Sequence, residues 1–191
     1  MSATVPPAQP VKELVVSVHE LARQPGASRQ LDLAVKAPMG MGSPVIEVLE
    51  GQELGLELLL ESVLEGVLAS GTVTTEAQGQ CVRCLSPLLL PVEVSFQELF
   101  SYPERVVAAT EAGDLDNDSL QVIDDLVDLN IPVRDAVVLA LPFRPLCQDS
   151  CPGLCSECGV ELAGQVDHTH AKVDPRWSPL EQLAIEREEK S

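Results

Sequence analysis

Residues 72–97 read TVTTEAQGQCVRCLSPLLLPVEVSFQ, and they contain the main signal for the fold. The stretch begins with β-prone threonine and valine, and from Leu88 to Phe96 every second residue is apolar. Such alternation is typical of a strand with one buried face. We therefore expect a β-hairpin whose tip presents the thiols of Cys81 and Cys84. Pro91 lies inside the second strand, which predicts an edge strand or a bulge.

Other segments add strands and one internal helix. Residues 14–18 and 31–36 have strand patterns. Residues 53–70 are ambiguous, because leucines alternate while glutamates recur every four residues. Interior glycines and stacked like charges oppose a helix there, so a strand is favoured. A helix is expected over residues 133–141, before Pro142. The predicted fold class is α+β: an antiparallel β-rich body, a few short helices and a C-terminal Cys/His metal-knuckle segment.

Three regions are predicted along the chain. Residues 1–10 are polar and proline-rich and are expected to be disordered. Residues 11–145 form the β-rich body, which contains an acidic loop or linker at 104–119. Residues 146–191 form a Cys/His zinc-binding tail with a terminal helix, since SPLE at 178–181 has the pattern of a capping box.

Potential metal ligands are concentrated near the C-terminus. Cys-x2-Cys followed by glycine is a tight knuckle that directs two thiolates at one point. Zinc completes a tetrahedron when two further cysteines or histidines arrive from another segment. The first predicted set of metal ligands is Cys155, Cys158, His168 and His170. A second set consists of Cys81, Cys84, Cys147 and Cys151.

The residues alone leave the division of these ligands open. Cys151-x3-Cys155 is also a usable ligand spacing, and Cys147 can lie outside both sites. One zinc ion is expected, or two, each structural, because four protein ligands leave no open position for water or substrate. Disulfides are disfavoured, because residues 1–16 do not have the pattern of a signal peptide. We expect a cytoplasmic protein with reduced thiols.

The composition limits the class of partner. The chain has 30 acidic and 12 basic residues and a formal net charge of −18. Such a surface repels phosphate backbones, whereas nucleic-acid-binding proteins normally present basic ones. A basic protein partner is therefore expected if the chain acts near nucleic acid. Residues 104–128 hold eight carboxylates and one base; the part from 104 to 119 is predicted to be a linker, with a contact to a basic partner as the alternative.

Sequence motifs of catalysis are missing. The chain has no His-Glu-x-x-His pair, no Gly-x-Ser-x-Gly elbow and no glycine-rich phosphate loop. No apolar run approaches the roughly 20 residues that span a bilayer. We expect neither an enzyme nor a small-molecule substrate nor a membrane association.

Five motifs occur in a characteristic order: Cys81-Val-Arg-Cys84-Leu85 with Pro87, Leu139-Ala-Leu-Pro142, Pro145-Leu-Cys147, Cys151-Pro-Gly-Leu-Cys155-x2-Cys158-Gly159, and Asp174-Pro-Arg-Trp177-x2-Leu180. Together they resemble the DUF177 family, also called the YceD family, in the version found in Gram-positive bacteria such as actinobacteria. The resemblance covers most of the chain. Other members carry Cys-x-Cys in place of His168-x-His170, a change that keeps the capacity to bind a metal.

This resemblance implies a bacterial cytosolic protein that is linked to accumulation of the large-subunit 23S ribosomal RNA, with no enzymatic activity. The family's gene commonly neighbours that of a small zinc-ribbon protein of the large ribosomal subunit. The expected function is a non-catalytic factor in large-subunit biogenesis that contacts a basic ribosomal protein and associates only indirectly with 23S rRNA. Two alternatives remain: a thiol-redox or metal-handling protein using Cys81 and Cys84, and a zinc-stabilised adaptor.

Overall fold

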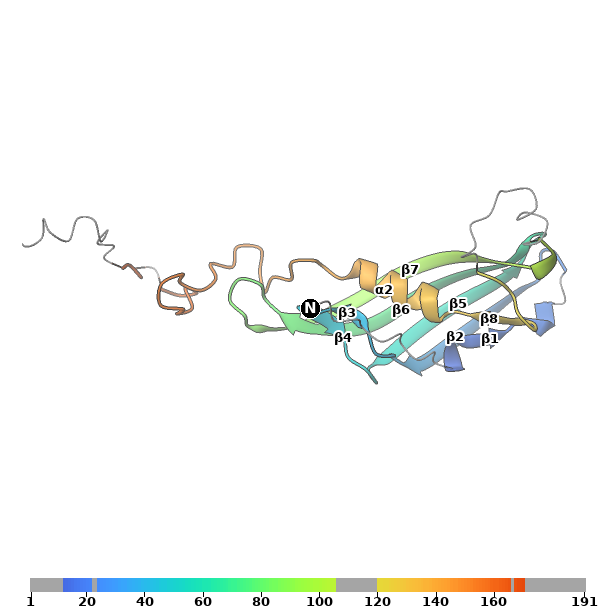
Figure 1. Ribbon diagram of the computed structural model, residues 1–191, viewed down its shortest axis with the longest axis horizontal. Coiled ribbons are helices and arrows are strands. Elements are labelled where there is room, and N and C mark those ends of the chain that lie inside the picture. Colours follow the sequence, from blue (N-terminus) through green and yellow to red (C-terminus); the bar gives the residue numbers. More distant parts are fainter. Residues whose placement is uncertain (1–11, 22–23, 106–119, 166, 171–191) are drawn as a thin grey trace, which may run out of the picture.

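The computed structural model describes residues 12–21, 24–105, 120–165 and 167–170 of the 191-residue chain. In chain order the elements are η1 (Lys12–Leu14), β1 (Val15–Ser17), η2 (His19–Leu21), β2 (Ser28–Lys36), β3 (Met41–Ser43), β4 (Ile46–Val48), β5 (Glu53–Ser62), β6 (Gly66–Gln80), β7 (Pro87–Ser101), β8 (Leu126–Asp128) and α2 (Asn130–Ala140), where η marks a 3-10 helix. Figure 1 shows the long strands side by side, with the described part of the segment after α2 extending beyond one end of the sheet.

Six strands form one antiparallel sheet. β5 pairs with β2 on one side and with β6 on the other. β7 follows β6 over its whole length, in one unbroken register from Gly66↔Ser101 to Gln80↔Pro87. β5 and β4 pair with successive parts of β6 and so share its other edge, and β3 follows β4. β7 is therefore an edge strand without a bulge, which decides between the two readings of Pro91.

One face of this sheet is buried. The leucines at positions 54, 56, 58 and 60 of β5 are at most 2% exposed, and Glu53, Glu57 and Glu61 project from the opposite face. A four-residue spacing keeps side chains on one face of a strand, because four is a multiple of the two-residue strand period. The strand prediction for residues 53–70 is confirmed as β5 and the start of β6.

The second layer consists of α2 and the two-stranded sheet β1–β8, which lie across the long strands in Figure 1. α2 contacts β7 and β3, and it buries Val133 and Val137, which lie four residues apart on one helix face. The N–H of Leu129 donates to the C=O of Leu14 (3.0 Å), which connects the start of α2 to the N-terminal segment. Phe100 of β7 is the largest fully buried side chain in the core between the layers.

The structure confirms the predicted α+β fold class with its antiparallel β-rich body, and it confirms the hairpin over residues 72–97. The predicted helix begins at Asn130 rather than at residue 133. Pro132 fits the first helical turn, because the N–H that proline lacks has no helical partner there. The strand predicted over residues 14–18 is shortened by η1 and spans Val15–Ser17.

Several predictions fall on residues that the structure does not describe. They are the disorder predicted for residues 1–10, most of the acidic loop predicted at 104–119 and the terminal helix predicted after residue 178. Within the described ranges, no helix combines the length and the apolar character needed to cross a membrane.

Candidate metal centres

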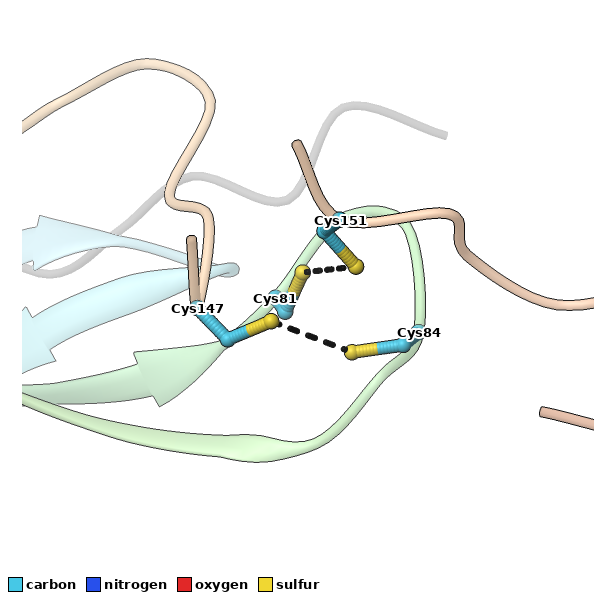
Figure 2. Close-up of side chains that lie close together, drawn as sticks. All are labelled: Cys81, Cys84, Cys147 and Cys151. Carbon is cyan, nitrogen blue, oxygen red and sulfur yellow. Dashed lines mark hydrogen bonds between the residues drawn. The ribbon is translucent and has the colours of Figure 1, made fainter. Parts of the chain in front are cut away.

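The tip of the β6–β7 hairpin is a tight knuckle. The N–H of Leu85 donates to the C=O of Cys81 (2.8 Å), and the N–H of Cys81 donates to the C=O of Ser86 (2.9 Å). Leu85 has a left-handed backbone with φ of 61°. Such a conformation costs about 1–3 kcal/mol in a non-glycine residue and persists only where surrounding contacts impose it. The knuckle brings the thiols of Cys81 and Cys84 toward one point, as Figure 2 shows.

Two further cysteines, from the segment after α2, meet the knuckle (Figure 2). The Sγ atoms of Cys81 and Cys151 are 3.8 Å apart, and those of Cys84 and Cys147 are 3.7 Å apart. All four Sγ atoms lie within 4.8 Å of one another. A disulfide requires about 2.05 Å, whereas a tetrahedral ion with metal–sulfur bonds of about 2.3 Å places its sulfurs about 3.8 Å apart. We call this group the hairpin site; it can hold a tetrahedral metal ion.

Hydrogen bonds hold the C-terminal segment against the knuckle. The N–H of Val82 donates to the C=O of Pro145 (3.0 Å), and the N–H of Leu154 donates to the C=O of Arg83 (3.1 Å). The Arg83 guanidinium donates to the C=O of Cys151 (2.8 Å). The hairpin site thus joins two parts of the chain that also bond to each other directly.

Close packing completes this junction. Gly153 has φ of 80°, and a Cβ at this position would lie 3.1 Å from the backbone oxygen of Arg83, so glycine suits both the conformation and the close approach. Leu88, Leu146 and Leu154 pack against the buried cysteines in an apolar cluster separate from the main core. The hairpin site is therefore largely shielded from water.

The four thiols of the hairpin site differ in pKa. Burial raises the pKa of Cys81, but backbone hydrogen bonds, chiefly that from Cys147, outweigh burial and lower it from 9.0 to about 6. Hydrogen bonding to Ser86 lowers the pKa of Cys84. The side chain of Cys151, followed by burial, raises the pKa of Cys147 to about 12, and burial raises the pKa of Cys151. Four thiolates this close repel one another, and a dication would favour the ionised form of all four.

A second knuckle lies at residues 155–160 and repeats the first. The N–H of Gly159 donates to the C=O of Cys155 (2.9 Å), and the N–H of Cys155 donates to the C=O of Val160 (2.8 Å). Gly159, with φ of 72°, occupies the position that Leu85 has in the hairpin. The same backbone pattern therefore presents Cys155 and Cys158 as a pair.

Two histidines complete the second group, which we call the tail site: Cys155, Cys158, His168 and His170, with one ligand atom of each within 4.8 Å of the others. The Sγ of Cys158 lies 3.4 Å from Nε2 of His168, close to the roughly 3.5 Å expected around a tetrahedral ion. The Nε2 atoms of the two histidines are 2.9 Å apart, somewhat closer than the roughly 3.3 Å of an ideal tetrahedron. This group can also hold a metal ion.

Glu157 supports the tail site from outside. Its Oε2 lies 3.6 Å from Nδ1 of His170, and a carboxylate near this nitrogen favours the tautomer that leaves Nε2 available to a metal. Backbone hydrogen bonds from Cys158 and Glu157 lower the pKa of Cys155 to about 6. All four ligand residues of the tail site are exposed or half-buried, whereas three of the four in the hairpin site are buried.

The two groups have the same members as the two predicted ligand sets. The structure places Cys151 with the hairpin and Cys155 with the histidines, and it includes Cys147 in the hairpin site. Metal occupancy itself remains a prediction. Sequence reasoning did not identify Arg83 or Glu157 as supporting residues, because a contact to a backbone carbonyl or to a ligand's second ring nitrogen has no diagnostic spacing.

Comparison with known proteins places the chain in a family. Residues 69–184, which include both sites, match the family described as "Large ribosomal RNA subunit accumulation protein YceD". The chain belongs to the YceD family. The match begins within β6 and therefore also includes the whole β6–β7 hairpin except its first three residues.

Mycobacterial relatives match a longer part of this YceD protein than the family model does. It is 42% identical to "Uncharacterized protein Rv2926c" of Mycobacterium tuberculosis over 170 residues, which cover 89% of this chain and 81% of the relative. It is 36% identical to "Uncharacterized protein ML1660" of Mycobacterium leprae over 170 residues, which cover 89% of this chain and 77% of the relative. No solved structure matches the chain significantly.

Proposed function

We propose that this protein is a non-catalytic cytoplasmic factor in biogenesis of the large ribosomal subunit that supports accumulation of 23S rRNA. The match to the YceD family carries this proposal, since the family's description names large ribosomal RNA subunit accumulation. The two Cys/His sites serve the architecture rather than a reaction. Each has four protein ligands, and a tetrahedral ion held by four protein ligands has no open position for water or substrate.

Zinc is the proposed ion in both sites. Thiolate and imidazole ligands in tetrahedral sets favour zinc over the harder ions that prefer oxygen. In the hairpin site the ion would fix the segment around Cys147 and Cys151 to the tip of the sheet. In the tail site it would order a segment with few apolar residues, which is the usual role of zinc in small modules.

The partner in this proposal is a basic protein of the large subunit, with 23S rRNA contacted only through it. The net charge of −18 opposes binding to phosphates. The solvent-exposed face of the sheet is also acidic. Along β5 it presents Glu53, Glu57 and Glu61, and Asp32 lies beside Glu57 in the β2–β5 register. Lys36 is the base on this part of the face, and it lies 4.0 Å from Glu53.

A thiol-redox function is the second candidate, because the pKa of Cys81 is lowered to about 6. A redox cysteine must also be accessible to its substrate. Cys81 is fully buried, and it lies in a β-turn rather than at a helix N-terminus. The structural role is therefore favoured.

The binding properties test the proposed function. We expect the tagged protein to recover a basic large-subunit protein, identified by mass spectrometry, and to release it as the salt concentration rises, because exposed ion pairs are screened. Naked 23S rRNA fragments should show negligible affinity at physiological salt, since Lys and Arg are needed to neutralise phosphates. RNA sequencing of the recovered material, with and without ribonuclease treatment, distinguishes direct binding to RNA from binding through the protein partner. Tight, sequence-selective binding to free rRNA would exclude the protein-mediated mechanism.

A further inference from the structure

Among the residues that the structure describes, the outer edge of β7 is long and unpaired. β7 pairs with β6 at every position from Pro87 to Ser101. Within the described part of the chain, residues 87–100 have no backbone hydrogen bond to any other segment. An open edge of this length is a template for pairing with another chain, and proteins normally block it.

The register identifies the backbone groups that point outward. At one end of the ladder, Ser86 accepts from Cys81, and at the other end Tyr102 donates to Glu65. In an antiparallel ladder the groups that face the partner strand recur every two residues. Even-numbered residues of β7 therefore face β6, and odd-numbered residues have their N–H and C=O directed away from the sheet.

Both ends of this edge are blocked. The N–H of Ser101 donates to the C=O of Leu120 (2.9 Å), and its C=O accepts from the N–H of Val122 (3.0 Å). At the other end, Pro87 and Pro91 occupy odd positions and have no N–H to offer. Residues 93–99 remain open, with outward N–H and C=O groups at positions 93, 95, 97 and 99.

The open stretch is exposed and acidic. Its sequence is EVSFQEL, with two glutamates and no base, and Glu93, Ser95, Gln97, Glu98 and Leu99 are all exposed. Lysine side chains commonly protect natural strand edges against pairing with another chain, and residues 93–99 contain no lysine. The other long edge strand, β2, differs: it carries Arg29 and Lys36 against one acid, Asp32, so it is less suited to a basic segment.

We propose that residues 93–99 of β7 bind an extended basic segment of the protein partner as an added strand of the sheet. This inference rests on the proposed function and specifies where and how the partner is held. Main-chain hydrogen bonds to the four odd positions supply affinity. Lysine or arginine side chains that flank the added strand lie near Glu93 and Glu98 and supply selectivity.

Charge favours a basic partner over a second copy of this chain. Two β7 edges paired with each other would bring four glutamates together, on chains that each carry a net charge of −18. Like charges across paired strands are destabilising. Self-association of the purified protein through this edge would contradict the proposal.

Amide exchange gives the sharpest test. A short, capped peptide of alternating lysine and valine is added to the full-length protein, and amide exchange is followed by NMR. We expect exchange to slow at least about tenfold at residues 93, 95, 97 and 99. The intervening amides of Val94, Phe96 and Glu98 already bond to β6 and should change little. The same peptide with every backbone amide N-methylated keeps its charge and has no N–H group on either edge, so it should protect none of residues 93, 95, 97 and 99.

A matched pair of variants tests the partner itself. Gln97→Pro removes an outward N–H without removing a bond to β6, and Gln97→Ala removes only the side chain. Proteins extracted from purified large ribosomal subunits are offered to wild type and both variants, and the bound basic protein is quantified. We expect Gln97→Pro to weaken binding at least about tenfold, equivalent to about 1.4 kcal/mol, and Gln97→Ala to bind as wild type does.

The outcomes separate the two proposals. Equal binding of the basic protein to wild type and to folded Gln97→Pro would overturn the added strand and leave the proposed function in place. Binding of no large-subunit protein by wild type would overturn both. If Gln97→Pro does not fold, the exchange experiment on wild type tests the added strand by itself. Protection that does not alternate between odd and even residues along 93–99 would then reject the added strand.

Discussion

Replacing Cys151 with serine is expected to remove one of two zinc ions and to release residues 145–154 from the hairpin tip. Cys151 is 3% exposed, and its Sγ lies 3.8 Å from that of Cys81. A structural zinc site contributes on the order of 10–16 kcal/mol in small zinc-finger peptides, far more than the few hydrogen bonds that otherwise join these segments. Native mass spectrometry should count one ion fewer, and the amides of Val82 and Leu154 should exchange at least about 100-fold faster.

Cys158→Ser is the matched control for this variant. It makes the same substitution in the tail site, whose ligand residues are exposed or half-buried. It should also lose one ion, but the amides of Val82 and Leu154 should stay protected, because the hairpin site is intact. The double variant should contain no zinc. If Cys151→Ser and Cys158→Ser lose the same ion, the division into two sites is wrong.

Replacing Phe100 with alanine should produce the largest loss of global stability. Phe100 lies in β7, is 1% exposed and is the largest fully buried side chain. Truncating such a residue lowers the free energy of unfolding by about 3–5 kcal/mol, since apolar contacts are lost and a cavity remains. Urea unfolding followed by circular dichroism measures the change, and both zinc ions should remain bound in the folded variant.

Phe143→Ala provides the comparison, because this phenylalanine is 94% exposed, just after α2. The same chemical change should alter the free energy of unfolding by less than about 0.5 kcal/mol. Equal effects of the two substitutions would show that the sheet and α2 do not enclose the core described above.

The local features of the fold were predictable from sequence because they follow the two-residue strand period. Alternation around Cys81 and Cys84 predicted the hairpin, and Pro91 limited the second strand to an edge or a bulge. The choice between these required the unbroken β6–β7 register. The glutamates of β5 suggested a helix because their four-residue spacing fits both a helix and one face of a strand. Only the buried leucines between them separate the two.

The candidate sites show the same limit. Cys155, Cys158, His168 and His170 lie close together in sequence, so spacing favoured their grouping, although Cys151-x3-Cys155 left the division of the ligands open. The hairpin site joins residues up to 70 positions apart. The spacing of cysteines in the sequence does not predict whether the C-terminal segment folds back onto the hairpin. The pairing of β1 with β8 is equally non-local. Which edge of the sheet is open follows only from the hydrogen-bonded register.

We propose that this protein supports accumulation of the large-subunit RNA through its folded, zinc-bound form. The most direct measurement is the ratio of 23S to 16S rRNA in cells that lack the protein and express wild type, Cys151→Ser or Phe143→Ala. We expect the ratio to fall without the protein, to be restored by wild type and by Phe143→Ala, and to stay low with Cys151→Ser. An unchanged ratio in cells that lack the protein would show that it has no role in accumulation of 23S rRNA.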